Sequence, residues 1–172
     1  LHLDVEVRQI EEVLRAATQR ERYEFHKIAA VRPNDLLAAM NRIRPHFFHF
    51  SGHGNGGAIH LLDDDNQARA VSKTHLGDLF KLYRKDIACV FLNACYGAQQ
   101  AEAISQHIPK VIGTRAAIPD SVAIQYATLF YQAIGEGGDI EYAFEYAKMS
   151  VGMNGMMGGE ELVMISGGGG NS

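Results

Sequence analysis

The feature that most constrains the fold is a short apolar run in the middle of the chain. Residues 87–92 (Ile-Ala-Cys-Val-Phe-Leu) are all uncharged, and almost all are hydrophobic. A strand with one solvated face alternates apolar and polar residues, whereas a continuous apolar run is typical of a strand covered by helices on both faces. The run therefore predicts a parallel sheet in an α/β protein.

The rest of the chain alternates between helix-like and strand-like segments, as such a fold requires. Apolar periodicity predicts strands at 23–28, 46–50, 58–62, 87–92, 110–114 and 161–165. It predicts helices at about 4–18, 33–44, 72–84, 99–107, 119–134 and 140–151. The acidic segment 63–66 is expected to form the turn of a hairpin whose first arm is the strand at 58–62. We therefore expect a mostly parallel central sheet with helices on both faces.

Composition excludes several classes of protein. The chain has 172 residues, of which 47% are hydrophobic and 21% charged, as in one soluble globular domain. Sixteen Lys and Arg against twenty Asp and Glu give a net charge of −4, so we expect no direct nucleic-acid partner. No apolar run approaches the ~18 residues that span a bilayer, and residues 1–6 do not resemble a signal peptide. We expect a cytoplasmic protein with no membrane contact.

The two cysteines point to the same compartment. If Cys89 and Cys95 lie on one strand, their six-residue separation is ~20 Å. A disulfide needs Cα atoms within about 7 Å, so both are expected to be thiols, which fits a reducing environment.

Three motifs that suggest a cofactor or a metal fail on their context. The glycine-rich stretch 52–57 matches G-x-G-x-x-G but precedes a predicted strand instead of a helix, which disfavours a nucleotide-binding switch. His49 and His53 are four residues apart in β and glycine sequence, so they do not share a helical face. The acidic run 63–65 lacks the spacing of a calcium loop. We expect neither a metal nor a cofactor.

A more specific pattern follows two of the predicted strands. The strand at 46–50 leads to His53, and the strand at 87–92 leads to Cys95. Ligands of open α/β sheets bind beyond the carboxyl ends of the strands, so adjacent strands would bring the two side chains together. A thiol beside an imidazole is a nucleophile paired with a base. The backbone N–H groups of Gly54 and Cys95 would then face the developing oxyanion.

Each of these residues also has a simpler interpretation. Taken singly, Cys95 fits a small buried hydrophobe and His53 a turn residue. Their joint position after two strands favours the catalytic pair.

The same residues resemble a known family, the CHAT domains, which are caspase-like cysteine peptidases related to separases. The resemblance rests on residues 44–54 (Arg-Pro-His-Phe-Phe-His-Phe-Ser-Gly-His-Gly), 93–96 (Asn-Ala-Cys-Tyr), 111–113 and 117–120, and it covers the chain to about residue 151. It implies a caspase-like three-layer sandwich in which His53 and Cys95 form the catalytic dyad. It further implies an endopeptidase that cleaves a protein substrate.

The resemblance also bears on domain organisation and regulation. Such domains begin with a buried strand before the first helix, so we expect residues 1–166 to form the peptidase domain with its first strand upstream of Leu1. The tail 167–172 has linker composition and is either native or a remnant of cloning. A harmful protease needs control, so we expect activation by a partner protein, a sensor domain or homo-oligomerisation. The family suggests bacterial defence or programmed cell death.

Asp120 has two interpretations that the sequence leaves open. It follows Pro119 at the start of a predicted helix, where a carboxylate caps or stabilises the first turn. In the family, an acid near this position lines the pocket for the substrate residue before the cleaved bond and pairs with a basic side chain there.

Two further alternatives stay open. The glycine- and methionine-rich segment 152–159 is either a plain loop or a segment that gates the active site. The chain as a whole could instead be a non-catalytic CHAT-type interaction module in a signalling assembly, although both members of the dyad are present.

Overall fold

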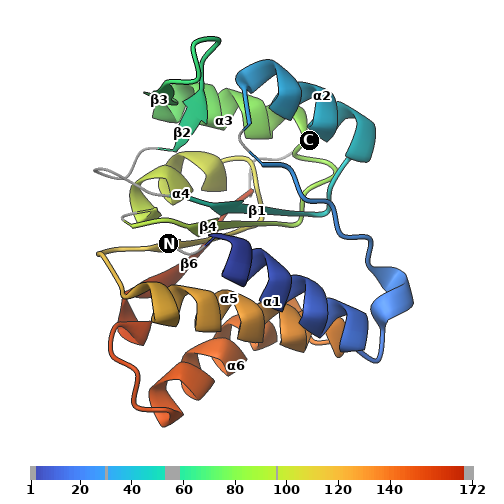
Figure 1. The fold of residues 1–172 in the computed structure, drawn as a ribbon, viewed down its shortest axis with the longest axis vertical. Helices are drawn as coiled ribbons and strands as arrows, with labels where there is room; N and C mark the ends of the chain where they lie inside the picture. The colour runs from blue at the N-terminus through green and yellow to red at the C-terminus, as the bar shows by residue number, and fades with distance from the viewer. Residues whose placement is uncertain (1–2, 30, 53–58, 96, 169–172) are drawn as a thin grey trace. The chain divides into compact units, whose positions relative to one another are not determined.

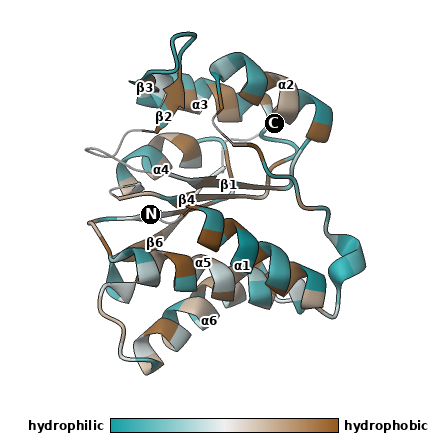
Figure 2. Cartoon of the chain, viewed as in Figure 1, coloured by the Kyte–Doolittle hydropathy of each residue, from teal (hydrophilic) through white to brown (hydrophobic). Residues whose placement is uncertain are grey.

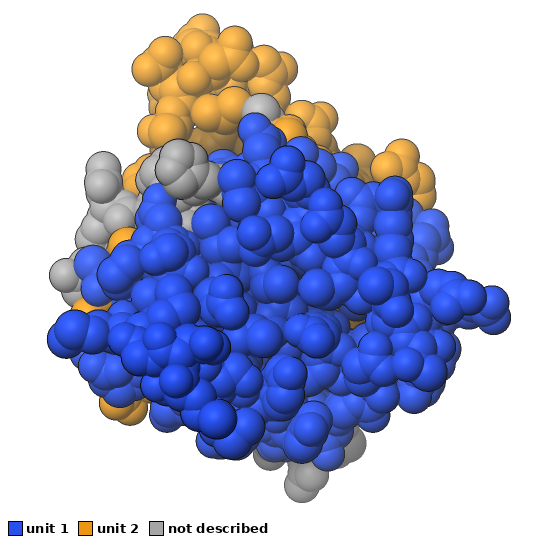
Figure 3. Space-filling model, turned by 60° about the horizontal axis from the view of Figure 1, so that its bottom comes forward, with its two compact units in different colours: residues 1–27, 117–162 blue, residues 28–116, 163–172 orange. Residues whose placement is uncertain are grey.

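A computed structural model describes residues 3–29, 31–52, 59–95 and 97–168. The chain divides into two compact units, each built from two separate stretches of sequence (Figure 3). Unit 1 contains Leu1–Lys27 and Ala117–Leu162, and unit 2 contains Ile28–Ala116 and Val163–Ser172.

Unit 2 is built on a four-stranded sheet with the order β1-β4-β5-β6 (Figure 1). Its strands are β1 (Phe47–Ser51), β4 (Cys89–Asn93), β5 (Lys110–Thr114) and β6 (Leu162–Ser166), of which only Leu162 is counted with unit 1. β4 pairs in parallel with β1 on one side and with β5 on the other. Every residue of β4 is buried, which confirms the prediction from its continuous apolar run.

Three helices of unit 2 share one hydrophobic core with this sheet. They are α2 (Pro33–Ile43), α3 (Lys73–Leu82) and α4 (Ala98–Ser105). The side chain of Ser72 accepts a hydrogen bond from the N–H of His75 and so caps α3. The core includes Met40 of α2, Phe80 of α3, Val90 and Leu92 of β4, Ile104 of α4 and Val111 of β5.

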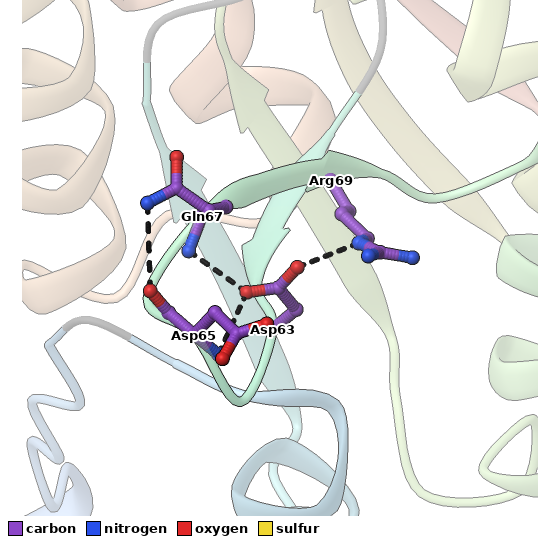
Figure 4. Close-up of polar contacts among 4 residues, drawn as sticks. All are labelled: Asp63, Asp65, Gln67 and Arg69. Atoms are coloured by element: carbon purple, nitrogen blue, oxygen red, sulfur yellow. Dashed lines mark hydrogen bonds and ion pairs between the residues drawn. The ribbon is translucent and has the colours of Figure 1, made fainter.

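A small hairpin forms a separate two-stranded sheet in unit 2, from β2 (His60–Leu62) and β3 (Ala68–Ala70). Asp63 organises its turn (Figure 4). Its carboxylate accepts hydrogen bonds from the backbone N–H groups of Gln67 at 2.8 Å and Asp65 at 3.0 Å, and it pairs with Arg69 Nε at 2.6 Å. These contacts, first among them the Gln67 N–H, lower the pKa of Asp63. The predicted hairpin is confirmed.

Unit 1 is helical. It contains α1 (Leu3–Ala16), α5 (Asp120–Gly135), α6 (Ile140–Met153) and the short 3₁₀ turns η1 (Arg20–Arg22) and η2 (Gly159–Glu161). α5 packs against both α1 and α6. Figure 2 shows hydrophilic and hydrophobic residues along α1, and Ile10 on this helix is 3% exposed. α1 is therefore amphipathic, as its sequence predicts.

The strand predicted at 23–28 is wrong. These residues follow η1 without regular secondary structure, and no strand among the described residues pairs with them. Phe25 and Ile28 are 37% and 43% exposed, so the alternating pattern does not bury one face. Tyr23 instead donates a hydrogen bond from its hydroxyl to the Ile134 carbonyl at the end of α5. A strand needs a neighbour for its backbone groups, and alternation alone does not supply one.

The fold class predicted from sequence is confirmed. The structure is α/β, with a mostly parallel four-stranded sheet flanked by helices, and it is consistent with a caspase-like sandwich. Beyond β6, Gly167 donates to the Pro109 carbonyl and Gly168 to that of Ser105, so the first two tail glycines contact unit 2. Among the described residues, no helix combines the length and apolar character needed to cross a bilayer.

Candidate active site

The candidate site begins where two neighbouring parallel strands end together. β1 and β4 are paired over their full length, and their final residues, Ser51 and Asn93, are partners. The N–H of Gly52 then donates to the Asn93 carbonyl over 3.5 Å, so the chain leaving β1 stays beside the end of β4. The predicted adjacency of the two strands is therefore confirmed.

The two predicted residues that follow β1, His53 and Gly54, lie outside the described residues. Each of the five pairs between β1 and β4 joins residues 42 positions apart. His53 and Cys95 are separated by the same 42 positions. In the sequence, His53 comes two positions after Ser51, the last residue of β1, and Cys95 comes two positions after Asn93, the last residue of β4.

Cys95 lies in the turn between β4 and α4, and its side chain is half-buried. Cys89 lies at the start of β4 and is 1% exposed. Both are thiols and not partners in a disulfide, as predicted. Of the two, only Cys95 is placed where a reagent or a substrate can reach it.

The turn that carries Cys95 is fixed through the carbonyl oxygen of Ala94. This oxygen accepts a hydrogen bond from the N–H of Gly97 at 3.1 Å and another from Thr114 Oγ1 at 2.8 Å. Thr114 is the last residue of β5 and is 1% exposed. A third strand end therefore supports the turn.

Glycine at position 113 allows β5 to lie close to the same turn. A Cβ at Gly113 would stand 2.9 Å from both the Ala98 nitrogen and the Gly97 carbonyl carbon. These are backbone atoms at the start of α4, which cannot move aside as a flexible side chain could. The absence of a side chain at 113 is thus a packing requirement.

Asp120 is the first residue of α5 and is exposed, while Pro119 occupies the N-cap position. A carboxylate in the first helical turn stabilises the helix, as one of its two sequence interpretations requires. Asp120 belongs to unit 1 and Cys95 to unit 2. The substrate-binding role of Asp120 stays a prediction.

Within the part of the chain that the structure describes, no group of three His, Cys, Asp or Glu side chains could hold a metal ion. His49, considered above as a metal ligand, instead packs its ring 4.9 Å from that of Phe91.

Sequence reasoning missed the contribution of Thr114. The available signal was its place as a polar residue at the end of a strand in an α/β sheet, the position where functional groups of such folds gather. That signal does not reveal which carbonyl the hydroxyl reaches.

Comparison with known proteins adds evidence of another kind. No family model matches the chain. The chain is 24% identical to a protein of Gillisia limnaea named a probable protease, over an alignment of 159 residues that covers 90% of this chain. It is 25% identical over 129 residues, 71% of this chain, to a protein from an unknown prokaryote named a Roc-COR-CHAT protease.

Both relatives are named proteases. They support a peptidase at the level of the family, and the second name points to the CHAT type. The chain matches only 28% and 12% of the lengths of these two proteins.

Proposed function

We propose that this chain is a cysteine endopeptidase in which Cys95 is the nucleophile and His53 the general base. The observation that carries the proposal is the shared offset of 42 positions between the β1–β4 pairs and between His53 and Cys95. Neighbouring strands lie about 4.8 Å apart, so the paired strand ends Ser51 and Asn93, two residues before His53 and Cys95 in the sequence, are close together. The protease names of both relatives support the same reaction class.

The proposed mechanism uses a thiol, an imidazole and two amides. His53 accepts the proton of the Cys95 thiol, and the sulfur attacks the carbonyl carbon of the cleaved peptide bond. The N–H groups of Gly54 and Cys95 donate to the resulting oxyanion. His53 then protonates the departing amine, which leaves a thioester on Cys95. A water molecule, deprotonated by His53, hydrolyses the thioester and regenerates the thiol. No cofactor takes part.

Regulation is proposed from the second relative. Its name joins CHAT to Roc and COR, and this chain matches only 12% of its length. We propose that activity of this chain is controlled by a partner or sensor domain, with homo-oligomerisation as a further means of activation. We also propose a cytoplasmic location, with which two unlinked thiols are compatible, and a role in bacterial defence or cell death.

Asp120 is the proposed specificity residue. A carboxylate in the pocket for the residue before the cleaved bond would pair with Arg or Lys of the substrate. The test measures how fast the unaltered chain and Asp120→Asn cleave peptides after Arg or Lys, compared with cleavage after Asp. Loss of the preference for a basic residue in Asp120→Asn supports the pocket role, and an unchanged preference removes it.

The experiment that tests the dyad is labelling of Cys95 by a peptide that carries an electrophilic ketone. We expect labelling in the unaltered chain, none in Cys95→Ala, and a decrease of about 10²-fold or more in His53→Ala. His49→Ala is the matched control, because this imidazole lies on β1 four residues earlier and takes no part in the proposed mechanism. Labelling unaffected by His53→Ala would indicate a merely exposed thiol and favour the non-catalytic interaction module.

A further inference from the structure

We propose that Thr114 is a positioning residue, whose hydroxyl orients the peptide between Ala94 and Cys95 so that the Cys95 N–H meets the oxyanion. This inference rests on the proposed function, since it assigns the device that aims one of the two proposed amide donors. It adds a third strand, β5, to a site otherwise built from the ends of β1 and β4.

Thr114 contacts the peptide bond between Ala94 and Cys95 directly. Thr114 Oγ1 donates to the Ala94 carbonyl oxygen at 2.8 Å, the length of a well-formed hydrogen bond. The N–H of Gly97 donates to the same oxygen at 3.1 Å. Two donors thus hold one carbonyl oxygen, which has two lone pairs. The Thr114 side chain is 1% exposed, so water does not readily replace its hydroxyl there.

The geometry of a peptide bond links the Ala94 oxygen to the direction of the Cys95 N–H. In a planar trans peptide, the carbonyl oxygen and the N–H of the next residue point in opposite directions. Holding the Ala94 oxygen toward β5 therefore directs the Cys95 N–H away from β5. Rotation of this peptide plane would need the Thr114 and Gly97 hydrogen bonds to break together.

Thr114 is held in place by the close packing of β5. Gly113, the residue before Thr114, lies so close to the start of α4 that a Cβ there would stand 2.9 Å from the Ala98 nitrogen. β5 also pairs with β4 through Val90–Val111 and Phe91–Ile112, all four of which are buried. The Thr114 hydroxyl is thus carried by a strand that is packed on two sides. Such rigidity suits its proposed role, because an oxyanion donor must be aligned before the reaction begins.

The test compares two reactions of the same sulfur. With p-nitrophenyl acetate, the Cys95 thiolate attacks the ester carbonyl and forms a tetrahedral oxyanion, p-nitrophenolate then leaves, and an acetyl thioester remains. With iodoacetamide, the thiolate displaces iodide at a saturated carbon and no oxyanion forms. The ratio of the two rates at Cys95, followed by mass spectrometry, therefore isolates oxyanion stabilisation from the reactivity of the thiol.

Thr114→Val removes the hydroxyl and keeps the shape of the side chain, and Thr114→Ser keeps the hydroxyl. We expect Thr114→Val to lower the acylation rate about 10- to 100-fold, since loss of a whole oxyanion donor costs ~10²–10³-fold. The iodoacetamide rate should change less than about twofold, and Thr114→Ser should restore acylation. Thr114→Ala is the second variant if the valine protein does not fold.

Thr128→Val is the matched control. Thr128 also donates its hydroxyl to a backbone carbonyl at 2.8 Å, that of Ile124, but it lies on α5 in unit 1. Its substitution measures the effect of losing such a bond elsewhere in the chain, and the rate ratio should not change.

Each other outcome contradicts the proposal in a recognisable way. An unchanged ratio in Thr114→Val, or an equal fall of both rates, overturns the positioning role while leaving Cys95 as the nucleophile. An unaltered chain whose Cys95 reacts with iodoacetamide but is not acylated overturns the proposed function, and the role of Thr114 with it.

Discussion

Ser51 and Asn93 are the last paired residues of β1 and β4, and the N–H of Gly52 extends this contact by donating to the Asn93 carbonyl. The two strands therefore end together, and neither Gly52 nor Ala94 continues its strand. The chemistry proposed for this chain depends on that edge. The predictions below test the edge, the turn that follows it and the packing of each unit.

The two thiols should differ in reactivity in the native protein. Cys95 is half-buried in a turn, whereas Cys89 is 1% exposed within β4. We expect iodoacetamide to modify Cys95 at least about tenfold faster than Cys89, because Cys89 becomes accessible only when β4 opens. Peptide mapping by mass spectrometry measures both rates.

Denaturation supplies the control for this prediction. In urea the two rates should become similar, since both thiols are then solvated. Equal rates in the native protein would contradict the buried position of Cys89.

Two glycine substitutions should have opposite effects on stability. Gly113→Ala places a Cβ 2.9 Å from backbone atoms of Gly97 and Ala98, so we expect a loss of about 1–3 kcal/mol in the free energy of unfolding. Gly152→Ala is the matched substitution, because Gly152 lies in α6 with no atom within 4 Å of the added Cβ. It should stabilise the protein by about 0.5–1 kcal/mol, as expected for alanine in a helix. Urea unfolding measures both, and a neutral Gly113→Ala would contradict the close approach of β5 to α4.

The β2–β3 hairpin should loosen in acid. The Gln67 N–H and the Arg69 guanidinium lower the pKa of Asp63, so its contribution to the hairpin is present above the ordinary value of 3.8 and is lost as pH falls through the lowered one. Amide exchange should show severalfold lower protection of Gln67 at that acidic pH than at pH 7.

Asp63→Asn should reproduce this loss of protection at pH 7, because it removes the charge and one acceptor oxygen. Asp64→Asn is the control, since Asp64 is exposed in the same turn. Equal effects of the two substitutions would show that the carboxylate contacts of Figure 4 do not hold the turn.

Unit 1 should lose stability in alkali. Tyr126 is fully buried between α5 and α6, where its hydroxyl donates to the Phe144 carbonyl at 3.3 Å. Burial, with a smaller effect from the Glu145 charge, raises the pKa of Tyr126 above its ordinary value of 10.0. The unfolded chain therefore releases this proton first, and stability should fall by up to about 1.4 kcal/mol for each pH unit above 10.

Comparison with Tyr126→Phe isolates this effect, because the variant lacks the titrating group. Its urea midpoint should depend less on pH between 9 and 11 than that of the unaltered chain. Tyr142→Phe is the control, since Tyr142 is 58% exposed, and it should leave the dependence unchanged.

Local sequence patterns predicted most of the sheet. The apolar run at 87–92 became β4, and the strand at 110–114 has the predicted bounds, because burial on both faces requires continuous hydrophobicity. Ser72 capped α3 because a side-chain oxygen at that position meets a helical N–H. The strand at 23–28 failed because pairing depends on a neighbour that local alternation does not specify.

The site could be predicted only in part. Two strand ends identify the segments that carry His53 and Cys95, since such ends meet at one edge of a parallel sheet. The Thr114–Ala94 contact joins residues 20 positions apart. The Thr114 hydroxyl reaches the Ala94 carbonyl because of the pairing of β4 with β5 and the path of the chain after Asn93. Neither is encoded in a local pattern.

The shared offset between β1 and β4 has a consequence for sequence change. Because β1 and β4 are held together by their own ladder, the length of the turn between β2 and β3 can vary without shifting one strand end against the other. The exposed turn at Asp64 and Asp65 is thus a natural point for inserted sequence, such as an affinity tag or a reporter. A single residue gained or lost within β1 or β4 would instead move the later side chains of that strand to the opposite face of the sheet.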